Sequence, residues 1–190
     1  MMRLLKVFGL VAAIFGSWFI AACEGGLNLR PATQLNIQDT VRIYALRGTP
    51  ISQPSGFHLP TSRVMRTDQP GFDIAFDVDA AGTALMYPAG ALGLPAEAGI
   101  VKVNSTFDGV TSAPPSSEFV TSQPLAIPDE TVFVVRSAPY GGDCGLSGAL
   151  PRYGKFRVLS FDPATRSVAL EILINVNCGY RDLRPGIPTN

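Results

Sequence analysis

Residues 72–79 read Phe-Asp-Ile-Ala-Phe-Asp-Val-Asp. Apolar side chains recur at every second position, and Asp73, Asp77 and Asp79 fill positions between them. This period of two is typical of a β-strand with one buried face. The turn-forming residues 79–82 follow, and residues 83–87 then favour a returning strand. The segment therefore predicts a β-hairpin whose carboxylates lie on its solvent-exposed face and near its turn.

The same alternation recurs near the C-terminus, where residues 155–161 and 167–176 predict two strands joined by a loop at 162–166. Proline- and glycine-rich stretches separate the remaining strand candidates, and no segment after residue 23 sustains a helical stripe for three turns. This pattern predicts an all-β antiparallel sandwich with Greek-key-like connections, and a small β-barrel is the alternative. We expect one β-rich domain over residues 40–190. The further strands are expected at 41–46, 63–66, 100–104, 119–122 and 131–137.

The N-terminus has the order of charge and hydropathy found in secretory signals. Arg3 and Lys6 precede an apolar run over residues 7–20, and Ile20-Ala21-Ala22-Cys23 follows. This tetrapeptide resembles the lipobox of bacterial lipoproteins. A transmembrane anchor would need about 20 apolar residues, and an ordinary cleaved signal would leave Cys23 without a role.

The resemblance implies that residues 1–22 are a signal peptide, removed by cleavage before a diacylglyceryl-modified Cys23. Lipoproteins as a class carry two or three acyl chains, palmitate among them, so the implied partner is a lipid bilayer. We expect an exported protein of the cell envelope, with residues 23–39 as a flexible tether. In lipoproteins of enteric bacteria an Asp after the cysteine favours the inner membrane. Glu24 stands there in this chain, so the resemblance favours the outer membrane.

The charge balance excludes one class of partner. The chain has 15 basic and 15 acidic residues, and removal of Arg3 and Lys6 with the signal leaves a net charge of about −2. Nucleic-acid binding requires a basic surface to neutralise phosphates. No basic run exists, so we expect no nucleic-acid partner.

Two cysteines, Cys144 and Cys178, remain after the signal. An even count in an exported chain predicts a disulfide. The alternative is a reactive thiol or a metal site that includes His58, the only histidine. Zinc sites require three or four ligands at paired spacings, which the sequence lacks. We therefore expect no metal and no cofactor.

Enzyme motifs are equally scarce. The G-x-S-x-G elbow, H-E-x-x-H and the Walker phosphate loop are all absent, and His58 is predicted to lie in a surface loop. A carboxylate-based envelope hydrolase stays open as an alternative. Asp77 and Asp79 resemble the start of a calcium loop, although Ala81 and Pro88 occupy ligand positions. A calcium-stabilised adhesion module is therefore a further alternative.

The predicted disulfide would gather tyrosine, arginine and aspartate side chains around it. Tyr and Arg are enriched at binding hot spots, although packing at the loop ends explains the same residues. Residues 72–79 and 177–181 also resemble segments of uncharacterised secreted bacterial β proteins, which implies an all-β domain. The leading hypothesis is a non-enzymatic binding or interaction module that recognises an unidentified envelope protein or ligand. Its candidate binding residues are Tyr140, Asp143, Tyr180, Arg181, Asp182 and Arg184.

Overall fold

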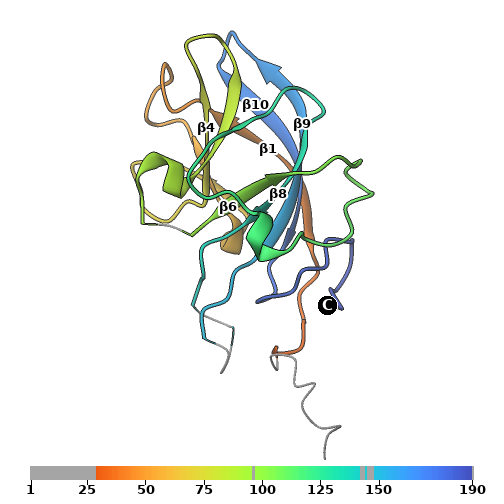
Figure 1. The fold of residues 1–190 in the computed structure, drawn as a ribbon. Helices are drawn as coiled ribbons and strands as arrows, with labels where there is room; N and C mark the ends of the chain where they lie inside the picture. The colour runs from red at the N-terminus through yellow and green to blue at the C-terminus, as the bar shows by residue number, and fades with distance from the viewer. Residues whose placement is uncertain (1–28, 96, 142–143, 145–147, 190) are drawn as a thin grey trace, which may run out of the picture.

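The computed structural model describes residues 29–95, 97–141, 144 and 148–189 (Figure 1). The expected signal peptide, the expected lipidation site Cys23 and the candidate residue Asp143 lie outside the described residues.

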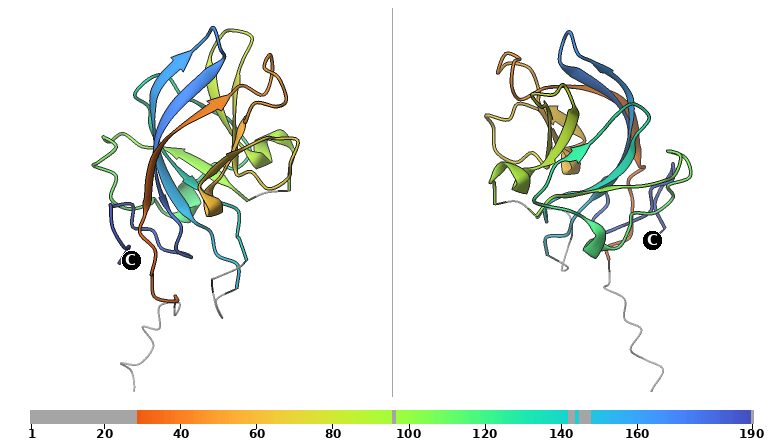
Figure 2. Two further views of the ribbon diagram at one scale, coloured as in Figure 1. Left: turned by 180° about the vertical axis from the view of Figure 1, so that it is seen from behind. Right: turned by 45° about the horizontal axis from the view of Figure 1, so that its top comes forward.

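The described strands form two five-stranded antiparallel sheets that pack face to face (Figures 1 and 2). The sheets are not closed, so the predicted sandwich, and not the alternative barrel, is the observed fold. The first sheet has the order β1 (Ile37–Tyr44), β10 (Ser167–Asn175), β9 (Tyr153–Asp162), β8 (Val132–Arg136) and β6 (Gly99–Lys102). The second has the order β3 (Arg63–Met65), β2 (Gly56–His58), β4 (Ile74–Val78), β5 (Ala84–Pro88) and β7 (Leu125–Ala126). Short 3₁₀ helices connect some of the described strands: η2 (Leu59–Thr61), η3 (Ala89–Leu92) and η4 (Ser116–Glu118).

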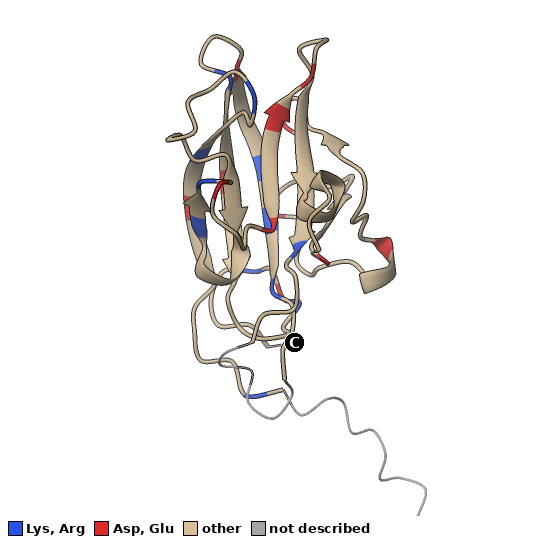
Figure 3. Cartoon of the chain, turned by 90° about the vertical axis from the view of Figure 1, so that its left-hand side faces the viewer, with Lys and Arg blue, Asp and Glu red and all other residues tan. Residues whose placement is uncertain are grey.

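Aromatic side chains fill the space between the two layers. Phe156 of β9 contacts Phe57 of β2 edge-on, with ring centroids 5.5 Å apart, and stacks on Phe133 of β8 at 5.2 Å. All three are fully buried. Aromatic pairs of this geometry stabilise a core beyond the burial of their apolar area. Figure 3 views the sandwich from the side and shows charged positions distributed over both sheets rather than gathered on one face.

The terminal hairpin follows the sequence prediction closely. β9 and β10 pair antiparallel, and the side chain of Asp162 organises their loop by accepting hydrogen bonds from Ala164 N at 2.9 Å and Thr165 Oγ1 at 2.6 Å. β10 also pairs with β1, from Ile37 opposite Ile174 to Tyr44 opposite Ser167. The first and last strands are therefore neighbours in the same sheet.

One expected strand is wrong. Residues 119–122 form only an isolated bridge, in which Val120 exchanges backbone hydrogen bonds of 2.9 and 3.0 Å with Ile100. Helix η4 ends directly before this segment, and Pro124 follows it. Because proline has no N–H to donate, the ladder does not continue beyond the single bridge.

The predicted wet face of β4 is also wrong, because this strand is buried on both faces. Asp73 and Asp77 are only 3% and 1% exposed. A second apolar layer covers the outer face of the sheet: Phe72, Ala75 and Ala89 pack there with Leu46 and Met65. Alternation along one strand does not reveal such a cover, since Leu46, Met65 and Ala89 lie outside the strand.

Part of the expected tether is bound to the domain. β1 begins at Ile37, earlier than the predicted residue 41, and Asn36 N donates to Gly186 O at 2.9 Å. The side-chain oxygen of Asn177 accepts from the N–H groups of Thr33 and Gln34, each at 3.1 Å. The described N-terminal segment and the C-terminal segment consequently lie side by side at one end of the sandwich (Figures 1 and 2).

Candidate functional site

A pocket of about 340 Å³ lies beside the second sheet. Its lining runs from exposed side chains, Tyr140 (42% exposed) and Leu94 (41% exposed), to the buried Asp73. Ordinary ligand pockets are concave and mostly apolar, with a few placed polar groups, and this pocket has that character. Its lining residues are His58, Pro60, Pro70, Gly71, Phe72, Asp73, Ala89, Leu94, Pro95, Ala138, Pro139 and Tyr140.

Asp73 is the most buried polar residue of the pocket. Its Oδ2 accepts a hydrogen bond from Leu59 N at 2.8 Å, and its Oδ1 accepts one from Ala138 N at 2.9 Å. Burial raises the pKa of this carboxyl to about 6, although the two amide hydrogen bonds oppose the shift. The carboxylate therefore fixes the first residue of η2 and the chain after β8 at one point, and carries a negative charge that water screens little.

His58 and Tyr140 stand together at the rim. Their rings meet edge to face with centroids 5.4 Å apart, and Nδ1 of His58 lies 2.8 Å from Thr61 Oγ1. The guanidinium of Arg152 lies 5.2 Å from the centroid of the Tyr140 ring. Burial, and secondly the charge of Arg152, lower the pKa of His58, so its neutral form is favoured.

A single carboxylate lines the described part of this pocket. Glycoside hydrolysis requires two carboxyl groups that flank the bond, and Asp73 is the only acidic residue among the described lining residues. Both oxygens of Asp73 already accept backbone amides. The pocket offers apolar walls, an aromatic rim and one buried carboxylate.

The predicted disulfide is confirmed: Cys144 and Cys178 are bonded, with their Cα atoms 5.3 Å apart. Of the candidate residues expected around it, only Tyr140 reaches the pocket. Asp143 lies outside the described residues, and the remaining four belong to the C-terminal segment.

Those four residues hold the C-terminal segment in place. The hydroxyl of Tyr180 accepts from Ala32 N at 3.2 Å, and the guanidinium of Arg181 donates to Ala113 O. Asp182, 3% exposed, accepts from Arg184 Nε at 2.9 Å and Nη2 at 2.7 Å. These hydrogen bonds hold the pKa of Asp182 well below its usual range. Packing and capping therefore account for these contacts.

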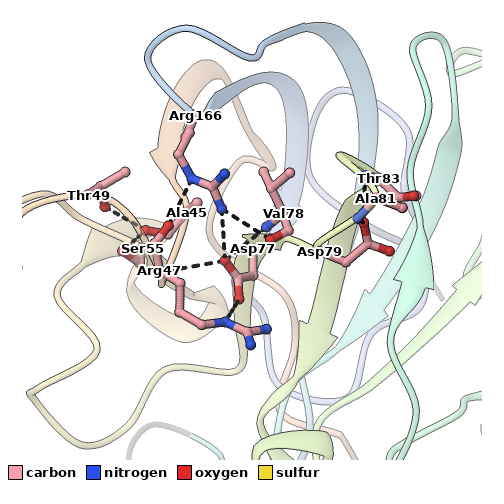
Figure 4. A network of polar contacts seen from close by, with 10 residues as sticks. All are labelled: Ala45, Arg47, Thr49, Ser55, Asp77, Val78, Asp79, Ala81, Thr83 and Arg166. Carbon is pink, nitrogen blue, oxygen red and sulfur yellow. Dashed lines mark hydrogen bonds and ion pairs between the residues drawn. The ribbon is translucent and has the colours of Figure 1, made fainter.

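The calcium candidates are already engaged by the protein (Figure 4). Asp77 Oδ2 accepts from Arg47 Nε at 2.6 Å, and its Oδ1 accepts from the backbone N–H groups of Arg47 and Val78. Asp79 Oδ1 accepts from the N–H groups of Ala81 and Thr83. A calcium ion there would have to displace a guanidinium from a buried carboxylate.

Neither a metal centre nor a spanning helix is found in the described part of the chain. Its residues contain no group of three or more His, Cys, Asp or Glu side chains arranged to hold a metal ion. Within the same residues, no helix has the length and apolar character needed to cross a bilayer.

Comparisons with known protein families, with characterised proteins and with solved structures found no match for this chain.

Sequence reasoning missed the two central polar residues of the pocket. It placed His58 in a surface loop and Asp73 on a wet strand face, whereas they line one pocket with Tyr140. The three residues are separated by 15 and 67 positions in the chain, and no local pattern links them. Prolines 60, 70, 95 and 139 also line the pocket, but they are spread along a chain of 16 prolines and gave no signal either.

Proposed function

We propose that this chain is an exported lipoprotein of the cell envelope, anchored through an acylated Cys23, whose β-sandwich binds a ligand without chemical conversion. The carrying observation is the pocket of His58, Asp73 and Tyr140, which combines apolar walls with a single buried carboxylate. Rigidly held loops on a β-scaffold are where binding residues usually lie. The lipobox-like Ile20-Ala21-Ala22-Cys23 supports the anchor, and Glu24 favours the outer membrane.

The pocket chemistry defines the class of ligand. Phe72, Leu94 and Tyr140 favour an apolar or aromatic group. The Asp73 carboxylate favours a hydrogen-bond donor or a positive charge, since buried carboxylates are stabilised by opposite charge. The ligand class is therefore an apolar group that carries an amine or another donor, including such a side chain on an envelope protein.

Binding is tested with 2-phenylethylamine and with the neutral 2-phenylethanol as probes, by NMR titration of the protein. We expect the amine to bind more tightly than the alcohol at pH 8. The difference should shrink below about pH 6, where Asp73 takes up a proton. Equal affinity for the two probes at pH 8 would contradict the assigned role of Asp73.

Two leucines of one loop provide a matched pair of variants. Leu94 lines the pocket and is 41% exposed, whereas Leu92 is 36% exposed and does not line it. Leu94→Arg should weaken amine binding about tenfold or more, because the long cation fills the entrance and repels the probe. Leu92→Arg should leave binding unchanged. If both variants bind as the wild type does, the pocket is not the binding site.

The anchor is tested separately by mass spectrometry of protein isolated from bacterial membranes. Cleavage before Cys23 with two or three acyl chains is the expected result. The Cys23→Ala variant should lose the acyl mass and the cleavage together. A wild-type mass that retains Met1 would contradict the anchor and leave the pocket proposal standing.

The calcium-stabilised adhesion module has no comparable support. The carboxylate of Asp77 is paired with Arg47, and that of Asp79 caps its own turn. The hydrolase alternative is supported only by the raised pKa of Asp73. Raised carboxyl pKa values also occur where burial alone causes them.

A further inference from the structure

The described N-terminal segment, residues 29–36, lies beside the C-terminal segment, residues 176–189, at one end of the sandwich, and we name this end the tether end (Figures 1 and 2). Its N-terminal half is fixed to its C-terminal half by side-chain amides. Asn177 Nδ2 donates to Gln34 O at 2.9 Å, and Asn36 Nδ2 donates to Arg184 O at 2.7 Å. Ala32 N also donates to the hydroxyl oxygen of Tyr180. The chain is therefore held on the domain from Ala32 onward.

A second pocket, of about 300 Å³, lies at the tether end and differs in chemistry from the pocket beside His58. Arg30 is exposed, and it makes no hydrogen bond or ion pair with any residue that the structure describes. Arg152 is buried, and its Nε donates to Val176 O at 2.7 Å. The lining residues are Arg30, Pro31, Thr33, Gln34, Arg152, Val176, Asn177 and Cys178.

The tether end is more positive than the rest of the molecule. Residues 29–36 and 176–189 carry Arg30, Arg181 and Arg184 against a single acid, Asp182, in a chain whose formal net charge is zero. Asp182 is already paired with Arg184 at 2.7 Å. Arg30, which lines the pocket, is thus left without an acidic partner among the described residues of the tether end.

We propose that this pocket binds the phosphate of an anionic phospholipid headgroup in the membrane that holds the protein; this inference rests on the proposed acylation of Cys23. Arg30 supplies the charge, and Thr33 and Gln34 supply neutral polar side chains beside it. The amide of Asn177 is already bonded to Thr33, Gln34 and Asn175, so it holds this wall of the pocket in place. Guanidinium groups favour phosphate because their donors match its oxygens.

The length of the chain explains why the membrane is the occupant. Ala32 is the ninth residue after Cys23, and an extended chain spans at most about 3.3–3.6 Å per residue, or roughly 30 Å in total. An anchored domain would thus keep its tether end near the headgroups, which raises their effective concentration at the pocket. Leu35 and Ile187, 65% and 53% exposed, lie at the same end and suit the membrane interface.

Tryptophan fluorescence provides the test, because Trp18 is the only Trp and belongs to the expected signal peptide. The lipidated Leu35→Trp protein, with its sole indole at the tether end, is reconstituted on vesicles of brominated phosphatidylcholine with increasing phosphatidylglycerol. The matched reporter is the Ile51→Trp protein, whose substituted position is 63% exposed in the wild type and follows the opposite end of β1. We expect phosphatidylglycerol to increase quenching in the Leu35→Trp protein, and the Ile51→Trp protein to stay unquenched.

Arginine variants in the Leu35→Trp protein test the headgroup. Arg30→Gln should raise the phosphatidylglycerol fraction needed for half-maximal quenching about fivefold, as expected for one surface charge. Arg63→Gln, an equal loss of charge on β3, should not. Equal quenching with and without phosphatidylglycerol, or equal effects of the two arginine variants, would overturn the proposal.

Two further outcomes are decisive. If inorganic phosphate at millimolar concentration abolishes the effect of phosphatidylglycerol, the pocket takes free phosphate and the lipid assignment is wrong. If wild-type protein retains Trp18 and carries no acyl mass, the proposed anchor fails, and this inference fails with it. A correctly acylated Leu35→Trp protein whose fluorescence is unquenched contradicts the present inference alone.

Discussion

Lys155 contacts Phe107 twice: its Nζ donates to the Phe107 carbonyl oxygen at 2.8 Å and lies 4.6 Å from the centroid of the Phe107 ring. The same Nζ donates to Val110 O at 3.0 Å. Lys155 is only 2% exposed, and burial lowers its pKa. A buried ammonium on β9 thus holds the loop that follows β6, through two carbonyl groups and one aromatic face.

We expect Lys155→Met to destabilise the protein by about 1–3 kcal/mol. The methionine keeps most of the apolar stem, but the carbonyl of Val110 loses the Lys155 donor, and the carbonyl of Phe107 keeps only the backbone N–H of Val110 at 3.3 Å. Urea unfolding of the disulfide-intact protein measures the change. Lys102→Met, at an exposed position of β6, should change stability by less than about 0.5 kcal/mol. Equal stability of the two variants would show that the hydrogen bonds of Lys155 to the loop after β6 do not stabilise the protein.

Asp73 should make the protein less stable as the pH rises from about 4 to 6. Its pKa is about 6 in the folded state against 3.8 ordinarily. Between these values the folded state holds a proton that the unfolded state has lost, so stability falls with rising pH. The difference corresponds to about 3 kcal/mol at 1.36 kcal/mol per pKa unit.

The measurement is the unfolding free energy of wild type and Asp73→Asn between pH 4 and pH 8. The unfolding free energy of Asp73→Asn should fall less with rising pH than that of the wild type, whatever the absolute stability of the variant. Glu118→Gln, an exposed carboxyl in η4, serves as the control and should leave the profile unchanged. Parallel profiles for wild type and Asp73→Asn would contradict the expectation.

Removal of the disulfide should destabilise the sandwich by roughly 3–4 kcal/mol on the chain-entropy model. Cys144 and Cys178 are 34 residues apart in sequence, so the bond restricts a long loop of the unfolded chain. The double variant Cys144→Ala/Cys178→Ala is compared with oxidised wild type by urea unfolding. A loss below about 1 kcal/mol would mean that strain or residual structure offsets the restriction.

Calcium at millimolar concentration should leave the melting temperature unchanged. A ligand that binds only the folded state must stabilise it, and the carboxylate of Asp77 is held by Arg47 and by two backbone amides. Differential scanning calorimetry with and without calcium measures the effect. A rise in melting temperature that Asp77→Asn abolishes would restore the adhesion hypothesis.

Much of the architecture was predictable from local pattern. The alternation in residues 155–161 and 167–176 predicted the hairpin of β9 and β10, and residues 72–79 predicted β4. These predictions succeeded because the side-chain period of a strand is a property of its own backbone. The segment at 119–122 failed because a strand also needs a partner over several residues, and only Ile100 provides one.

The candidate site was far less predictable. Sequence reasoning gathered residues around Cys144 and Cys178, and the bond formed as predicted. However, Arg181 and Asp182 serve the packing of the C-terminal segment, and the pocket uses His58 and Asp73 instead.

The sequence by itself determined the all-β character and the terminal hairpin, because the side-chain period of a strand is a local property. It also predicted the pairing of Cys144 with Cys178, on the expectation that Cys23 is acylated. Only the tertiary structure decided that Asp73 and Asp77 are buried, that His58 meets Tyr140, and that residues before Ile37 are bound to the C-terminal segment. The physical reason is that the burial and the electrostatic environment of a side chain depend on which other segments pack over its strand. The packing of the whole chain decides this.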